Sequence, residues 1–245
     1  MDSGIRAGIP RYDPSPCLRR RVTDWVTISS LATAGGTLVL AVATFSSVKS
    51  ANRSARVAER SLLVGMRPVL IPSREDDPLE RIRFGDGQIV QVPGHGGAAE
   101  VHDDNVFMAL GLRNGGSGLA VIHGWRARVR HDPDNPGAGR PNEAPDLDEF
   151  RQQQLDLFIP AGDSGFWQGA FRDPSLPGYA EVRDSLDGGG PIQTDLLYGD
   201  HEGGQRTIGR FVLAPWPTED DRPDVEHPMR AIVVRYWTVD GQDPR

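Results

Sequence analysis

Apolar and polar positions follow two different patterns along this chain. Residues 25–48 carry no charged side chain, and small or apolar residues continue at spacings of 3 and 4 as far as Gly65. A helix rises about 1.5 Å per residue, so this uncharged stretch reaches about 36 Å, enough to cross a hydrocarbon core of about 30 Å. We therefore predict one helix of about 40 residues, a membrane span followed by a basic stalk. It should end before Arg67-Pro68, where proline resets the backbone.

From Pro68 onward the pattern changes to short runs of β-forming residues separated by Gly, Pro, Asn and Asp. Residues 125–130, for example, alternate apolar and arginine side chains, as in an antiparallel strand covered on one face. Strands and helices do not alternate, so the fold class is mainly β, an antiparallel β-sandwich preceded by one long N-terminal helix. Helical patterns are limited to residues 146–154 and 179–186. The predicted strands are 69–72, 81–84, 88–92, 105–113, 119–130, 155–159, 165–171, 192–198, 205–213 and 229–239.

These patterns divide the chain into three parts. Residues 1–18 are rich in Gly and Pro and are predicted to be a disordered tail, 19–65 are the transmembrane helix and stalk, and 66–245 are the β-sandwich. Two alternatives remain for the apolar stretch. It could be a cleaved signal peptide, with Ala41-Val42-Ala43 as its cleavage site, or a buried helix of a soluble protein, given its eight Ser and Thr residues. Its length and its lack of charge over six turns favour a span.

Small residues recur in one heptad register of this helix. Small side chains let helix backbones approach closely, so the register predicts a homodimer through the helix. More than half of residues 27–58 are Gly, Ala, Ser or Thr, so composition alone also explains such a register. We call these positions the helix seam: Ala34, Thr37, Ala41, Val48, Ala51, Ala55 and Ala58.

Charge is distributed unevenly between the two parts. Residues 1–67 hold 10 Lys and Arg against 4 acids, which leaves 17 basic and 30 acidic residues of the totals of 27 and 34 for the body. The basic N-terminal part, residues 1–67, is attracted to anionic lipid headgroups, and the acidic charge of the remaining residues argues against nucleic acid as a partner. Four basic residues flank each end of the span within about 15 residues, so the positive-inside rule does not decide the orientation. The arginine-bearing stalk favours a cytoplasmic body on a single-pass cell-membrane protein.

Two short motifs stand out in the β-rich part. They are Arg67-Pro68-Val69-Leu70 and residues 112–120, which read L-R-N-G-G-S-G-L-A. With them the chain resembles a broad group of uncharacterised bacterial single-span membrane proteins, in which an N-terminal transmembrane helix precedes a β-sandwich. Gly115 and Leu119 stand where that group would have a branched residue and a proline. The resemblance implies this architecture but brings no activity, cofactor or ligand.

The second motif also has a local physical meaning. Its glycines permit positive φ, and an asparagine side chain can bond its own backbone, so residues 114–120 are predicted to join two strands by a tight, bulged connection. A strand rather than a helix follows, which argues against a phosphate-binding loop.

The most site-like cluster is Asp200-His201-Glu202, at the tip of a predicted hairpin. An imidazole between two carboxylates could bind a divalent metal or act as an acid–base pair. Neighbouring residues of a strand point to opposite faces, however, so a polar turn closed by Gly203-Gly204 explains the same residues. No spaced histidine pair or nucleophile motif is present, and no cofactor is expected.

Phe166 and Trp167 fall on opposite faces of one predicted strand. Either one of them contacts a protein partner, or both faces are buried. Two functional hypotheses follow. The chain is a non-enzymatic membrane-anchored protein whose β-sandwich is a protein-interaction or scaffolding module, or it is a membrane-tethered enzyme or ligand-binding sensor that uses the 200–202 hairpin. The expected partners are the lipid bilayer, a second copy and an unidentified protein.

Overall fold

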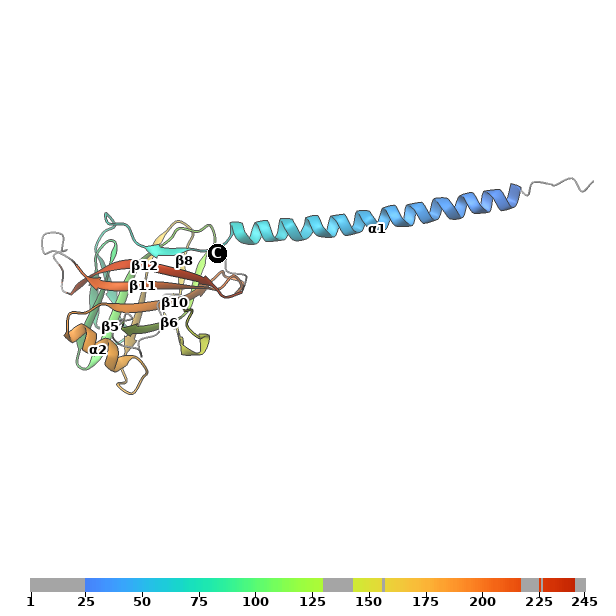
Figure 1. Ribbon diagram of the computed structural model, residues 1–245. Coiled ribbons are helices and arrows are strands. Elements are labelled where there is room, and N and C mark those ends of the chain that lie inside the picture. The colour runs from blue at the N-terminus through green and yellow to red at the C-terminus, as the bar shows by residue number, and fades with distance from the viewer. Residues whose placement is uncertain (1–24, 130–142, 156, 217–224, 226, 241–245) are drawn as a thin grey trace, which may run out of the picture. The chain divides into compact units, whose positions relative to one another are not determined.

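The computed structural model describes residues 25–129, 143–155, 157–216, 225 and 227–240. The chain divides into two units, Met1–Val57 and Ala58–Arg245, and their boundary falls inside the long helix. Figure 1 shows the helix and the strand-rich domain. The predicted disordered tail, residues 1–18, lies outside the described residues.

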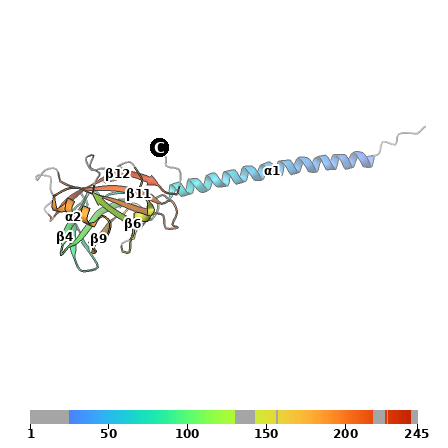
Figure 2. The same cartoon turned by 60° about the horizontal axis from the view of Figure 1, so that its bottom comes forward.

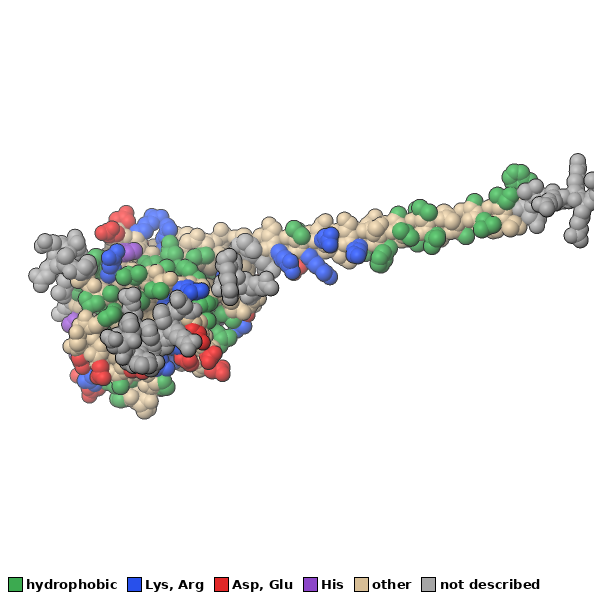
Figure 3. Space-filling view, viewed as in Figure 1, with side chains coloured by type: hydrophobic (Ala, Val, Ile, Leu, Met, Phe, Trp, Pro, Cys, Tyr) green, Lys and Arg blue, Asp and Glu red, His purple; other side chains and the backbone are tan. Residues whose placement is uncertain are grey.

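The long N-terminal helix is confirmed as α1, Trp25–Gly65. Its segment Trp25–Leu62 is long and apolar enough to cross a membrane, and none of its most apolar window is buried. Figure 3 shows the basic side chains gathered on one half of the helix, which matches Lys49 and the arginines that follow it. In the other half the hydroxyls of Ser29, Thr33 and Thr37 donate to backbone carbonyls of the same helix at 2.8–3.0 Å. Such bonds satisfy polar groups internally, so this serine and threonine content is compatible with a hydrocarbon environment.

The second unit is mainly antiparallel β structure, as predicted. Within the described residues, one ten-stranded sheet follows the order β1-β5-β4-β12-β11-β10-β6-β7, while β8 pairs with β6 and β9 pairs with β5. β2 and β3 form a separate hairpin. The strands are β1 (Leu70–Pro72), β2 (Glu80–Arg83), β3 (Ile89–Val92), β4 (Gly96–His102), β5 (Asn105–Asn114), β6 (Ala120–Val129), β7 (Arg151–Gln152), β8 (Phe158–Ile159), β9 (Ser164–Phe171), β10 (Ile192–Gly199), β11 (Thr207–Pro215) and β12 (Pro228–Thr238).

The large sheet curls so that its two halves face each other across one core, as the layers of a sandwich do (Figures 1 and 2). Side chains from β5, β6, β9, β10, β11 and β12 share this core. The helix α2, Tyr179–Asp187, packs against β6 and β10 and adds Tyr179 and Val182 to it. The β2–β3 hairpin covers the outer side of β4, β5 and β9, where Phe84 and Phe107 pack edge to face at 4.9 Å. Both faces of β9 are therefore buried.

The structure differs from the local predictions in two places. Residues 146–154 do not form a helix: they form a short 3₁₀ turn, Leu147–Glu149, and then β7. β4 was not predicted at all. Residues 114–120 do connect two strands, β5 and β6, but these two strands do not pair with each other: β5 pairs with β1, β4 and β9, whereas β6 pairs with β7, β8 and β10. The second helix, predicted at 179–186, is confirmed as α2.

Residues 115–119, which we call the arch, lead from one half of the curled sheet to the other. The arch lies directly on the segment that follows α1: Gly115 N donates to Val69 O at 2.8 Å, and a side chain added at Gly118 would meet Met66 O at 1.8 Å. Asn114 Oδ1 also accepts the Val69 N–H at 3.2 Å. The two motifs singled out in the sequence, residues 67–70 and 112–120, therefore pack against each other.

Candidate binding site at the sheet junction

The hairpin tip at residues 200–202 is a closed turn. The Asp200 side chain is buried, and its Oδ1 accepts the backbone N–H groups of Glu202 and Gly204 at 3.1 and 2.9 Å. The side chains of His201 and Glu202 are exposed. Across the described residues, no group of three or more His, Cys, Asp and Glu side chains is placed to hold a metal ion. The structure therefore does not bring the three predicted side chains together.

Trp167 and Phe166 are both covered by the fold. Trp167 is fully buried, and its indole N–H donates to Gln153 Oε1 at 3.1 Å. Phe166 is half-buried against the cluster under the β2–β3 hairpin. The curl of the sheet covers one face of β9 and the hairpin covers the other, so the Trp167 side chain is not exposed to a partner here, whereas a partner contact through Phe166 stays a prediction.

The helix seam lies on α1, where all of its side chains are exposed. This exposure leaves the register free to contact a second helix, and dimerisation stays a prediction. The residues concerned are Ala34, Thr37, Ala41, Val48, Ala51, Ala55 and Ala58.

A site that the sequence did not indicate lies where the two ends of the curled sheet meet, which we call the sheet junction. Here β7 and the residues after it face the open edge of β9. The Gln153 side chain bridges the two, because its Nε2 donates to Gln168 O at 3.1 Å and to Leu155 O at 2.6 Å. Its backbone N–H donates to His123 O at 2.9 Å. At this point a glutamine side chain links the two segments in place of a backbone–backbone hydrogen bond between strands.

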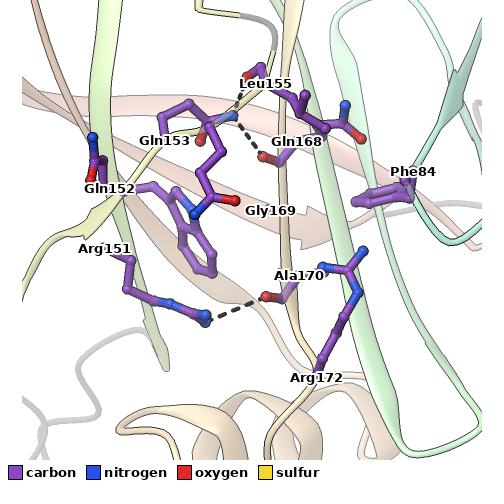
Figure 4. Close-up of a pocket in the computed structure, with 12 residues that line it drawn as sticks. Phe84, Arg151, Gln152, Gln153, Leu155, Gln168, Gly169, Ala170 and Arg172 are labelled. Atoms are coloured by element: carbon purple, nitrogen blue, oxygen red, sulfur yellow. Dashed lines mark hydrogen bonds between the residues drawn. The ribbon is translucent and has the colours of Figure 1, made fainter.

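Beside this bridge is a pocket of about 160 Å³, the junction pocket (Figure 4). None of its described lining residues is acidic, and two of them are arginines. The lining residues are Phe84, Gly85, Trp125, Arg151, Gln152, Gln153, Gln154, Leu155, Gln168, Gly169, Ala170 and Arg172.

Arg151 is the central residue of the junction pocket. Its guanidinium carbon lies 4.7 Å from the centroid of the Trp125 ring and 5.1 Å from that of Phe171. Stacking of this kind holds a guanidinium in place while its in-plane N–H groups stay free to donate. One of them, Nη1, donates to Ala170 O at 3.4 Å. No carboxylate of the described residues forms an ion pair with Arg151.

The surroundings of Arg151 destabilise its positively charged form. Burial, and then the nearby positive charge of Arg172, lower the pKa of Arg151. Arg172 differs from it, because Arg172 Nε lies 3.0 Å from Asp86 Oδ2 on the turn between β2 and β3. Figure 4 shows the two arginine side chains approaching Ala170 from different sides. The negative charge of Asp173 acts on the pKa of Arg151 in the opposite direction, but Asp173 makes no direct ion pair with Arg151, so an anion in this pocket would meet a partly buried cation without a bonded carboxylate.

No motif marks the junction pocket in the sequence. Its walls come from β7, β9 and the β2–β3 hairpin, and the run Arg151-Gln152-Gln153-Gln154 falls inside the stretch predicted as a helix. The only sequence signal is a polar run between two strands. Comparison of the chain with known protein families, with curated proteins and with solved structures finds no match in any of the three. The resemblance to bacterial single-span membrane proteins therefore stays a prediction.

Proposed function

We propose that this chain is a membrane-anchored binding protein whose β domain takes up an anionic group in the junction pocket. The observation that carries the proposal is the aromatic-stacked Arg151 guanidinium, which makes no direct ion pair with a carboxylate of the described residues and feels Asp173 only as a nearby charge. Hydrogen bonds between a guanidinium and an anion are about twice as strong as those between neutral groups. Residues 68–245 hold 30 acidic and 17 basic side chains, so a pocket lined by two arginines and no acid has the opposite charge to the domain around it.

The membrane anchor in this proposal is α1. Its exposed apolar residues, such as Leu38 at 67% and Phe45 at 72% exposure, need a cover that the described chain does not supply. The helix also continues unbroken through Ala41-Val42-Ala43, the segment that a signal peptidase would have to cleave. We retain the proposal of a cytoplasmic body at the cell membrane. A reporter fused to the C-terminus that works only outside the cytoplasm would reverse this orientation.

Anion binding is tested on the full chain in lipid nanodiscs, with sodium acetate and inorganic phosphate as probes at constant ionic strength. An anion that binds the folded protein raises its melting temperature by mass action. We expect one of these probes to stabilise the wild-type protein, and Arg151→Gln to abolish that effect.

The matched control is Arg81→Gln, which removes the same charge from an exposed position on β2. This variant should respond to the anion as the wild type does. Equal stabilisation of wild type and Arg151→Gln would refute the proposal, as would the absence of any response to both probes.

A further inference from the structure

Arg151 also lines a second cavity, of about 310 Å³, on the side of the Phe171 ring. This apolar cavity lies between the free end of β6, the turn before β7 and the residues that follow β9. Its apolar wall is formed by Ala127, Phe150, Phe171, Leu176 and Pro177. Arg151 is the residue that the two cavities share.

Three of the other charged residues around the apolar cavity, Arg126, Arg128 and Glu149, are paired within the fold, whereas Asp148, which also lines it, makes no ion pair among the described residues. Arg126 Nη2 lies 2.8 Å from Asp195 Oδ2, and its Nη1 lies 2.5 Å from Glu149 Oε2. Arg128 lies 3.8 Å from the same Glu149 oxygen. Asp195 is itself held by the buried Arg210, whose Nε lies 2.7 Å from Oδ1. Arg151 differs from these arginines, because among the described residues it makes no direct ion pair and Asp173 acts on it only as a nearby charge.

We propose that the sheet junction binds a small organic carboxylate with an apolar body. The carboxylate is held by Arg151, the residue that lines both cavities, and the apolar body lies against the apolar wall of the larger cavity. This inference rests on the proposed anion-binding function and names the class of ligand. A cavity of about 150 Å³ can hold a benzene ring, so 310 Å³ accommodates a ring with substituents.

The geometry of β9 argues against a peptide strand as the ligand. A peptide that extended the sheet would have to bond the free edge of β9. The carbonyls of Gln168 and Ala170 at that edge already accept hydrogen bonds from the side chains of Gln153 and Arg151. An added strand would have to displace both side chains, whereas a small acid can use the free N–H groups of Arg151 as they stand.

The experiment measures binding of acetate, benzoate and benzamide to the full chain in nanodiscs by calorimetry, with fluorine NMR of 4-fluorobenzoate as a second readout. We expect benzoate to bind at least about tenfold more tightly than acetate, because it buries an apolar ring. Benzamide has nearly the same shape but no charge, and should bind at least about tenfold more weakly than benzoate.

Two kinds of variant separate the two halves of the site. Arg151→Gln should lose both acids, and Arg81→Gln should lose neither. Leu176→Trp fills the apolar cavity, so it should lose the advantage of benzoate while keeping acetate. Leu176→Phe adds less volume to the cavity and should lower benzoate affinity by less. It replaces Leu176→Trp as the test variant if the tryptophan disturbs folding.

Each outcome distinguishes the inference from the function on which it rests. Equal affinity for acetate and benzoate would overturn the inference and leave anion binding intact. Benzamide binding as well as benzoate would overturn the role of Arg151. Tighter binding of a short peptide with a free C-terminal carboxylate would replace the small acid by a peptide. Binding of neither acid would overturn the inference and the acetate arm of the proposed function together, leaving only phosphate as a probe for the latter.

Discussion

Asn114 shows how one side chain holds three separate segments of the β domain. Its side chain is fully buried at the end of β5. Oδ1 accepts the N–H groups of Val69 and Gly116 at 3.2 and 3.0 Å, and Nδ2 donates to the carbonyls of Gly118 and Ile159 at 2.7 and 3.0 Å. This set of bonds requires a side chain that accepts through one atom and donates through another, as a carboxamide does.

Replacing Asn114 by alanine should therefore destabilise the β domain strongly. The change leaves one buried and three partly buried backbone groups without this partner. A buried group left unsatisfied costs about 1–3 kcal/mol and a partly buried one costs less, so we expect a loss of about 2–4 kcal/mol. Urea unfolding of the full chain, followed by tryptophan fluorescence, measures it. Ser117→Ala alters an exposed residue of the same arch and should change the stability by less than about 0.5 kcal/mol. A similar effect of both changes would mean that the amide bonds contribute little.

Asp240 and Arg206 make an ion pair whose contribution depends on pH. Arg206 Nη2 lies 2.7 Å from Asp240 Oδ1, and Nε lies 3.0 Å from Oδ2. The hydrogen bonds from the Arg206 side chain lower the pKa of Asp240 in the folded chain below the ordinary value of about 3.9. Because the folded pKa is the lower one, the pair stabilises the fold fully above about pH 5, and this contribution is lost as the pH falls through the folded pKa.

The expected contribution is at most about 1 kcal/mol, since the pair is partly exposed to solvent. Asp240→Asn should reduce the unfolding free energy at pH 7 and make progressively less difference toward pH 3. Carbon NMR titration of the Asp240 carboxyl gives a direct check, and its midpoint should rise in Arg206→Gln. An unchanged midpoint in that variant would show that the ion pair does not set the pKa.

For single residues, the sequence predicts hydrogen bonds to nearby backbone but not contacts with distant segments. The tendency of Asn114 and Asp200 to bond nearby backbone follows from their short polar side chains. For Asp200 this local tendency is the observed role. The partners of Asn114 at Val69 and Ile159 each lie 45 residues away, and no local rule identifies them.

Elements were predictable where the alternation of side chains was clear. β6 and β9 to β12 have strong patterns, and the structure places them within a few residues of the predicted ranges. β4 was missed because its sequence begins Gly-Gly-Ala-Ala, which lacks β-forming residues. Space explains that composition: a side chain added at Gly97 would meet Leu213 Cδ2 at 2.5 Å and Ala109 O at 2.6 Å.

The false helix at residues 146–154 has the opposite cause. Its acidic start is typical of a helix N-terminus, and the structure keeps only the 3₁₀ turn Leu147–Glu149. Arg151 and Gln152 instead pair with Trp125 and Gly124 of β6. Tertiary pairing thus overrides a local preference of a few tenths of a kcal/mol per residue.

The arch gives a sharp test of close packing between two elements. A side chain at Gly118 would lie 1.8 Å from the backbone oxygen of Met66, which has no freedom to rotate away. We expect Gly118→Ala to destabilise the β domain by about 1–3 kcal/mol, as overpacking usually does. Gly85→Ala has nothing within 4 Å of the added carbon and is the matched control. Equal midpoints of urea unfolding for the two variants would show that the arch tolerates a wider approach.

At the scale of the whole molecule, the plan of the chain was accessible from sequence but the site was not. A long uncharged helix and a β domain follow from charge and periodicity alone. The junction pocket forms because the curl of a ten-stranded sheet brings Arg151 of β7 against Ala170 of β9. Curl is a property of the assembled sheet, so neither strand carries a signal for the pocket.

Dimerisation through α1 is the prediction that belongs to the assembled protein in its membrane. If the helix seam mediates contact, Ala34 faces the partner helix, whereas Gly35 is turned away by about 100°. In a Cys17→Ser background, Ala34→Cys should cross-link efficiently in nanodiscs or native membranes and Gly35→Cys should not. Equal or absent cross-linking at both positions would mean that small residues in this register reflect composition. A dimer would also bring two β domains, and two junction pockets, to one place on the membrane, so a ligand carrying two carboxylates would bind with higher avidity than either site provides alone.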